Sequence, residues 1–145
     1  MRALSIGEIR EATGGELLFG REDVRISYIS IDSRDVKEDT LFVPLVGEKV
    51  DAHRFLEQVA KAGAKAVFTA TNLTEAQQSA LEAAGTAVIR VSDTLIALQA
   101  LSAWHRNRLS LPLVGVTGSV GKTTTREMIA AALSAKYRVF KTKAN

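Results

Sequence analysis

The spacing of apolar positions in the first part of the chain alternates between a helical and an extended period. Ser5 and Glu8 form the pattern of a capping box ahead of apolar residues at helical spacing, which predicts a first helix that Gly14 can end. Short apolar stretches between polar or glycine breaks predict strands at 17–19, 26–31 and 41–46. Pro44 lies inside the third of these. Because proline has no N–H, that strand should be at an edge of the sheet, or should end near this residue.

Helix and strand patterns then follow each other in turn. Apolar residues at helical spacing predict a helix over 53–63, and a short strand follows at 65–69. Thr74 has the position of a helix cap, Gly85 can end that helix, and 87–91 has the pattern of the next strand. This order is typical of βαβ units, so we predict an α/β fold with a mostly parallel sheet covered by helices.

The pattern changes after the last of these strands. A long helix is predicted at 92–108, with Leu95, Leu98 and Leu101 on one side. The stretch "LSLP" leads from it into a predicted strand at Leu113–Thr117, which begins a second unit. No internal repeat or low-complexity linker marks the boundary, and the pattern alone places it near 91–93. The predicted domains are a small α/β domain at 1–91 and the first strand–loop–helix unit of a parallel-sheet domain at 92–145.

Composition limits the classes of function. The chain has 145 residues and no cysteine, which excludes disulfides and thiolate metal sites and suits a reducing cytoplasm. No apolar run approaches the ~20 residues of a membrane span, so we expect a cytoplasmic protein without membrane insertion. The net charge is +3, but residues of both signs are interspersed, so we expect a basic surface and no nucleic-acid partner.

The stretch "LVGVTGSVGKTTTREM" at 113–128 has the outline of a phosphate-binding loop between a strand and a helix. In such loops backbone N–H groups point at phosphate oxygens, and the helix adds its positive amino-terminal end. Lys122 would neutralise phosphate charge as the catalytic cation, and the Thr123 hydroxyl would bind Mg²⁺. The predicted ATP-binding residues are Thr117, Gly118, Ser119, Val120, Gly121, Lys122, Thr123 and Thr124.

The loop departs from the general form of the motif. That form requires glycine five residues before Gly121, where this chain has Val116. The alternative is an ordinary glycine turn that joins a strand to a helix. The two histidines offer less: we expect His53 to cap its helix and His105 to pack beside Trp104, with no catalytic or metal role for either.

Two stretches together resemble the Mur ligase family. The form "TGSVGKTT" at 117–124 resembles the family's own version of the loop. Upstream, "IDSRDVKEDTLFVPLVGEKVDAHRF" resembles its amino-terminal signature, and "AGAKAVF" resembles the helix-to-strand turn that follows. One position departs, since Ala52 stands where the family usually has glycine. The resemblance covers nearly the whole chain in the family's order.

This resemblance implies a binding site for a uridine diphosphate substrate in the amino-terminal unit. Ser33 matches the signature serine near the diphosphate, and Ile31 would flank the uracil. Arg34 would pair with phosphate through its guanidinium. Glu48, Lys49 and Val50 would line the loop beside the uracil. The alternative for Asp32-Ser33-Arg34 is a turn after a strand with a surface ion pair.

The resemblance also implies an activity, that of an ATP-dependent amide ligase of peptidoglycan synthesis. The run "GKTTTREM" most resembles the branch that adds D-alanyl-D-alanine to UDP-N-acetylmuramoyl-tripeptide, and the branch that adds the third stem residue is the alternative. The family's ATPase domain continues well past the segment matched here. We therefore expect a fragment that does not catalyse ligation alone, and a non-catalytic module that binds UDP-muramyl peptide is the other interpretation.

Overall fold

The computed structural model describes residues 3–48 and 50–142, in two compact units, Met1–Leu109 and Ser110–Asn145. The first unit contains a five-stranded sheet in the order β2-β7-β6-β5-β4 and a small pair, β1 with β3. Strands β4 to β7 run parallel, and β2 pairs antiparallel with β7 at the edge. The strands are β1 (Leu4–Ser5), β2 (Glu16–Phe19), β3 (Arg25–Ile26), β4 (Tyr28–Ser30), β5 (Thr40–Phe42), β6 (Ala66–Thr69) and β7 (Ala87–Arg90).

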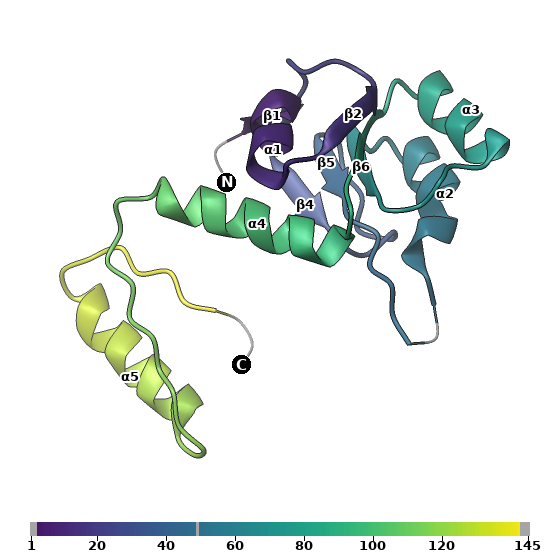
Figure 1. Cartoon of the computed structure of the whole chain (residues 1–145). Helices are drawn as coiled ribbons and strands as arrows, with labels where there is room; N and C mark the ends of the chain where they lie inside the picture. The colour runs from purple at the N-terminus through teal and green to yellow at the C-terminus, as the bar shows by residue number, and fades with distance from the viewer. Residues whose placement is uncertain (1–2, 49, 143–145) are drawn as a thin grey trace. The chain divides into compact units, whose positions relative to one another are not determined.

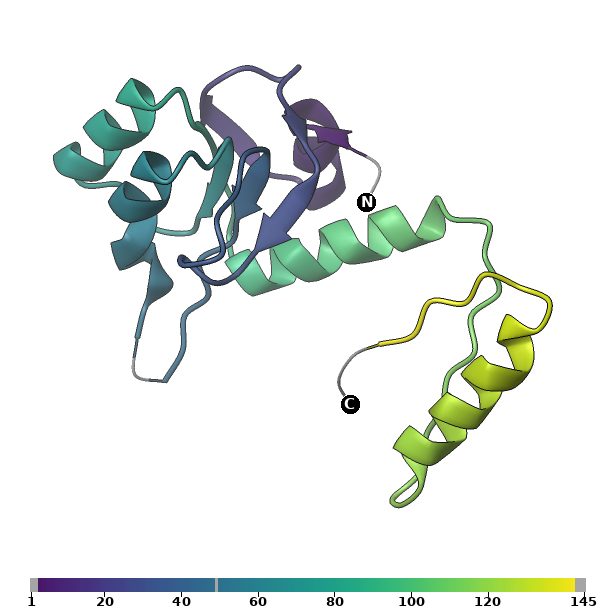
Figure 2. The same cartoon turned by 180° about the vertical axis from the view of Figure 1, so that it is seen from behind.

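Helices cover both faces of this sheet, as Figures 1 and 2 show from opposite sides. Alternate residues of the central strands point to opposite faces. In β6, Phe68 belongs to the cluster that packs α1 and α4, while Val67 belongs to the cluster that packs α2 and α3. The helices of this unit are α1 (Ile6–Thr13), the 3₁₀ helix η1 (Ala52–Phe55), α2 (Leu56–Lys61), α3 (Glu75–Ala83) and α4 (Thr94–Asn107). The predicted α/β fold with a parallel sheet is confirmed.

Two predicted helix starts, at Ser5 and Thr74, are confirmed by their caps. Ser5 accepts a hydrogen bond from Glu8 N at 3.1 Å, and the Glu8 carboxylate accepts one from Ser5 N at 2.9 Å. Thr74 and Gln77 form the same reciprocal pair at the start of α3. Two strands are shorter than predicted. The segment 26–31 is divided between β3 and β4, and β5 ends before Pro44, in the interior of the sheet.

Helix α4 packs on the first unit, which extends past residue 91 to Leu109. Its buried residues are Thr94, Ala97 and Leu101, and Leu98 is partly buried against the same cluster. The predicted apolar face was wrong in one position, since Leu95 is 49% exposed. The face that packs therefore includes Ala97, which is buried in the cluster shared with α1 and the sheet.

The second unit consists of an extended segment and one helix, α5 (Lys122–Ser134). The predicted strand Leu113–Thr117 is not formed, and within residues 110–142 no segment pairs with it. A strand needs a neighbour for its backbone hydrogen bonds, and this unit offers none among its described residues. In the parts of the chain that the structure describes, no helix is long and apolar enough to cross a membrane.

Candidate functional site

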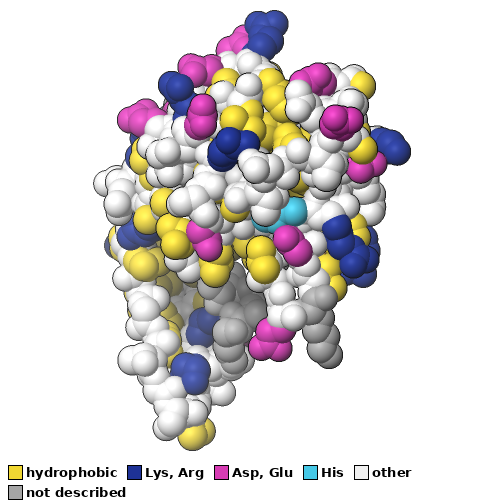
Figure 3. Space-filling model, turned by 45° about the vertical axis from the view of Figure 1, so that its right-hand side comes forward, with side chains coloured by type: hydrophobic (Ala, Val, Ile, Leu, Met, Phe, Trp, Pro, Cys, Tyr) yellow, Lys and Arg dark blue, Asp and Glu magenta, His cyan; other side chains and the backbone are white. Residues whose placement is uncertain are grey.

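The carboxyl ends of β4, β5, β6 and β7 lie along one edge of the first unit's sheet, because these strands are parallel. Ligands of open α/β sheets bind in the crevice outside such an edge. The segments that leave it carry the predicted site residues at 31–34 and 48–50. The face drawn in Figure 3 shows cationic and anionic side chains interspersed among hydrophobic ones.

The turn after β4 is held by Asp32 and Arg34. The Asp32 carboxylate accepts hydrogen bonds from Arg34 N at 3.0 Å, from Nε at 2.9 Å and from a terminal nitrogen at 2.7 Å. These side-chain hydrogen bonds from Arg34 lower the pKa of Asp32 to about 2. The Arg34 side chain is nevertheless 84% exposed, so its guanidinium is oriented by Asp32 and still open to solvent.

The start of this turn is fixed from within β4. The Ser30 hydroxyl donates to Asp32 O at 2.9 Å and accepts from Asp32 N at 3.1 Å. Ile31, directly after the strand, is 55% exposed. Ser33 is half-buried. Fixed backbone on both sides therefore presents an apolar side chain, a hydroxyl and a guanidinium within four residues.

The loop that follows β5 is a short hairpin. Val46 and Asp51 form an antiparallel bridge, Gly47 N donates to Val50 O at 2.9 Å, and Ala52 N donates to Leu45 O at 3.1 Å. Glu48 and Val50 are exposed in it, and Lys49 lies outside the described residues. Ala52 adopts no left-handed backbone, so the departure from glycine at this position causes no strain.

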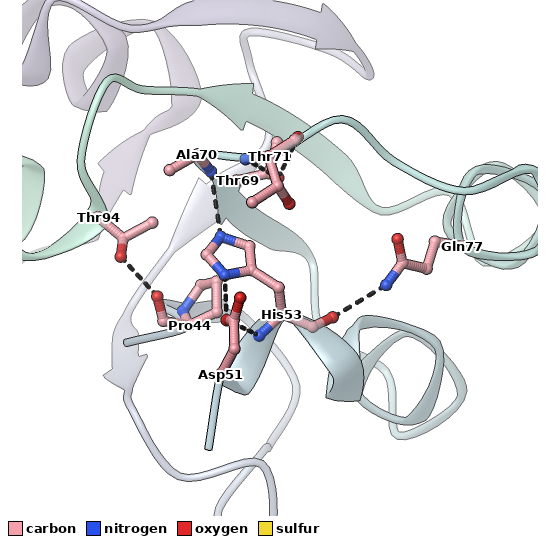
Figure 4. A network of polar contacts seen from close by, with 8 residues as sticks. All are labelled: Pro44, Asp51, His53, Thr69, Ala70, Thr71, Gln77 and Thr94. Atoms are coloured by element: carbon pink, nitrogen blue, oxygen red, sulfur yellow. Dashed lines mark hydrogen bonds and ion pairs between the residues drawn. The ribbon is translucent and has the colours of Figure 1, made fainter. Parts of the chain in front are cut away.

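A buried histidine supports this hairpin, and the prediction that His53 caps its helix was wrong. Asp51 is the cap of η1 and accepts from His53 N at 2.9 Å. The imidazole is instead bound between Asp51 Oδ1, 2.6 Å from Nδ1, and Ala70 N, which donates to Nε2 at 3.1 Å (Figure 4). Its partner Ala70 is 17 residues away, so no local pattern in the sequence could have indicated the contact.

The phosphate-loop candidate lies in the second unit. Gly118 and Gly121 have φ of 147° and 80°, values that favour glycine. Helix α5 begins at Lys122, directly after the loop, with Gly121 as its N-cap. The Lys122 ammonium donates to Gly118 O at 2.7 Å, so the lysine side chain folds back over the loop that it follows.

These features fit a bound phosphate. Positive-φ glycines, the amino end of a 13-residue helix and a lysine turned towards the loop are the three elements that bind a nucleotide phosphate. Thr117, Ser119 and Val120 lie in or next to this loop, and Thr123 and Thr124 lie in the first turn of α5. Described residues offer no group of three His, Cys, Asp or Glu for a metal, so Mg²⁺ here would depend on Thr123 and the phosphates themselves.

Two surface hollows are lined by none of these residues. One of about 310 Å³, in the first unit, is lined by Leu18, Phe19, Asn72, Leu73, Gln78 and Arg90. Another, of about 190 Å³, lies in the second unit beside Glu127 and Lys141.

Comparison with known proteins identifies the family. The model "Mur ligase family, catalytic domain" matches residues 25–106, more than half of the chain. This chain belongs to the Mur ligase family. The model "Mur ligase middle domain" matches residues 116–145, so parts of two Mur ligase domains follow each other here in order.

Individual Mur ligases agree with this assignment. The chain is 45% identical over 126 residues to UDP-N-acetylmuramoyl-tripeptide–D-alanyl-D-alanine ligase of Synechocystis, covering 86% of this chain and 26% of the relative. The structure resembles the UDP-N-acetylmuramoylalanyl-D-glutamyl-2,6-diaminopimelate–D-alanyl-D-alanyl ligase of Acinetobacter baumannii, with a TM-score of 0.81 at 30% identity. That match covers 94% of this chain and 29% of the other.

A third relative connects the family with a nucleotide. MurF ligase of Thermotoga maritima was solved in complex with ADP, and it matches with a TM-score of 0.69 at 30% identity, over 81% of this chain and 26% of the other. The chain thus spans about a quarter of the length of the relatives it matches.

Proposed function

We propose that these 145 residues form the substrate-binding and first phosphate-binding parts of a MurF-type ligase. Such an enzyme uses ATP to join D-alanyl-D-alanine to UDP-N-acetylmuramoyl-tripeptide in peptidoglycan synthesis, on which cell shape and division depend. The observation that carries the proposal is that two Mur ligase domain models match this chain one after the other. A D-alanyl-D-alanine ligase that is 45% identical to the chain supports the same branch. The nucleotide substrates place this reaction in the cytoplasm.

The reaction forms an amide bond by way of an acyl phosphate. The terminal carboxylate of the tripeptide takes the γ-phosphoryl group of ATP, and ADP leaves. The amine of D-alanyl-D-alanine then attacks the activated carbonyl, the bond from the carbonyl carbon to the phosphate oxygen breaks, inorganic phosphate leaves, and the nitrogen loses a proton. The protein's task in such a transfer is to position the groups and to neutralise charge.

The second unit supplies the phosphate contacts in this proposal. Amides at 117–121 and the amino end of α5 face the phosphates, and Lys122 exchanges its bond to Gly118 O for a phosphate oxygen. A Mg²⁺ ion held by Thr123 would screen the charge of the phosphates during transfer. We assign residues 110–145, and not 92–145, to the start of the ATP-binding domain, because α4 packs on the first unit.

The first unit binds the UDP part of the substrate in this proposal. Arg34, oriented by Asp32, pairs with the diphosphate, and the Ser33 hydroxyl hydrogen-bonds to it. Ile31 and Val50 offer exposed apolar surface for the uracil ring, and Glu48 lies in the same hairpin as Val50; the assignment of Lys49 rests on the sequence alone. We assign the first unit, which extends to Leu109, to this UDP-binding domain.

Calorimetric titration of the chain with UDP-N-acetylmuramoyl-tripeptide, and separately with Mg-ATP, tests the two binding roles. Lys122→Ala should remove the heat of ATP binding and leave that of the UDP ligand unchanged. Lys136→Ala is the matched control, because Lys136 lies beyond the far end of the same helix. Absence of UDP-ligand binding by the unaltered chain would refute the role of the first unit.

A chimera tests the ligase activity. This chain would replace the matching quarter of the Synechocystis relative, and amide formation would be measured with D-alanyl-D-alanine as the amine and either UDP-N-acetylmuramoyl-tripeptide or the corresponding dipeptide as the UDP substrate. Product from the tripeptide supports the proposal. A folded chimera that forms no product from the tripeptide would contradict it.

A further inference from the structure

His53 is the buried centre of a small polar network at the edge of the sheet that carries the candidate UDP site. Only 4% of the residue is exposed, whereas histidine is more often partly exposed. Its contacts come from three parts of the fold: Asp51 of the hairpin, Ala70 after β6, and Gln77 of α3, whose amide donates to His53 O at 3.0 Å (Figure 4).

The partners determine where the proton of the imidazole lies. Ala70 N–H is a donor only, so Nε2 must accept and carries no proton. The single proton of the neutral ring is therefore on Nδ1, which donates to Asp51 Oδ1. Hydrogen bonds from the backbone N–H and then the ring of His53 lower the pKa of Asp51, which keeps this carboxylate charged as the acceptor.

This network fixes one end of the hairpin. Asp51 is the residue that closes the hairpin through its bridge to Val46, and the same Asp51 is bound by His53. Through Nε2, the imidazole connects that end to the carboxyl end of β6. A neighbouring contact, from the Thr94 hydroxyl to Pro44 O at 2.5 Å, holds the other end of the segment to α4.

Between these two anchors, the described hairpin residues are joined to one another by the bridge and by backbone hydrogen bonds of the same segment. Gly47, Glu48 and Val50 are exposed, and the hydrogen bond from Gly47 N to Val50 O lies within the hairpin itself. A short exposed hairpin keeps one conformation only if its ends are held. Glu48 and Val50, the described hairpin residues of the candidate UDP site, are thus positioned through the ends of the hairpin, one of which His53 holds.

We propose that His53 is a positioning residue for the UDP part of the substrate, and that it acts by holding the hairpin Val46–Asp51 to the carboxyl end of β6. This inference rests on the UDP-binding role proposed above. In this proposal the histidine contacts no atom of the substrate. Its contribution is to preorganise the hairpin, so that binding does not have to order it.

Two substitutions separate the two bonds of the ring. His53→Asn keeps a donor near the Nδ1 position, towards Asp51, and removes the acceptor for Ala70 N. His53→Gln can still accept from Ala70 N and removes the donor to Asp51. Thr86→Val is the control, because the buried Thr86 hydroxyl donates to Ala64 O at 2.7 Å at the opposite end of the sheet. It also deletes one buried hydrogen bond.

The dissociation constant for UDP-N-acetylmuramoyl-tripeptide is measured by calorimetry for each variant, together with the midpoint of thermal unfolding. We expect His53→Asn to weaken binding about tenfold, the factor that corresponds to one lost buried hydrogen bond. His53→Gln should bind more tightly than His53→Asn. Thr86→Val should lower the unfolding midpoint to a similar extent and leave the affinity within about twofold of the unaltered chain.

Each outcome has one meaning. If both histidine variants bind as tightly as the unaltered chain, the positioning role is wrong while the UDP-binding role stands. If Thr86→Val weakens binding as much as His53→Asn, the effect is one of general stability and the positioning role is again wrong. If the unaltered chain does not bind the ligand, the proposed function fails, and this inference fails with it.

Discussion

Replacing Leu101 by alanine tests whether α4 is an integral part of the first unit. Leu101 is 1% exposed and belongs to the cluster of α1, α4 and one face of the sheet. A buried leucine replaced by alanine loses its transfer free energy and leaves a cavity, with a cost of about 2–5 kcal/mol. Because the surrounding strands are well packed and cannot collapse into the space, we expect about 3 kcal/mol here.

The matched control is a leucine-to-alanine substitution on the exposed face of the same helix. Leu95 lies in α4 as well, and it is 49% exposed. Leu95→Ala changes helix propensity and side-chain size in the same way but opens no cavity, so it should cost about 0.5 kcal/mol. The difference between the two variants therefore isolates the packing of α4 on the sheet.

Urea unfolding followed by circular dichroism and by tryptophan fluorescence measures both costs. Trp104 is the sole tryptophan, and it packs against the same cluster from α4, so fluorescence reports on this helix directly. Thermal unfolding provides a second measurement: for a domain of this size, a loss of about 3 kcal/mol should lower the thermal midpoint by about 12 °C or more. A difference of less than about 1 kcal/mol between the two variants would refute the packing of α4 as we describe it.

Three further predictions concern the candidate sites. In a carboxyl NMR titration, the pKa of Asp32 should be about 2, because Arg34 lowers it in the folded chain. The stability that this lowered pKa contributes is therefore present at neutral pH and is lost as the pH falls from about 4 towards 2. Arg34→Gln should move that midpoint back towards about 3.9, and an unchanged midpoint would contradict the cause given. Gly121→Ala forces a φ of 80° on alanine and should weaken Mg-ATP binding about fivefold in calorimetry, whereas Gly115→Ala, at a position with open space and no positive φ, should be neutral. Ser33→Ala should weaken binding of the UDP ligand about fivefold without changing the affinity for ATP, and equal losses for both ligands would contradict its assignment.

Local features of the fold could be predicted from the sequence because their partners are close along the chain. The capping boxes at Ser5 and Thr74 join residues three positions apart, and both are present. The same holds for the start of α5 directly after Gly121. In each case the spacing of residue types determines the hydrogen bond, and the rest of the fold has little influence on it.

Features that depend on distant partners were predicted poorly. The packed face of α4 includes Ala97 and leaves Leu95 exposed. The packing partners of this helix are α1 and the sheet, which are distant in the sequence. The strand at 113–117 does not form among the described residues, since a strand exists only with a neighbour. His53 has partners 17 and 24 residues away, so its place between the hairpin and β6 left no signal in the local pattern.

The glycine before α5 distinguishes this helix from the other α-helices that begin with a capping side chain. Ser5, Thr74 and Asp93 each satisfy a backbone N–H at the start of their helix, whereas Gly121 has no side chain with which to do so. An anion at this end would do for α5 what those side chains do for α1, α3 and α4. Binding of phosphate should therefore reduce fraying of the first turn of α5. Amide hydrogen exchange in that turn should slow in proportion to the fraction of the chain that has phosphate bound.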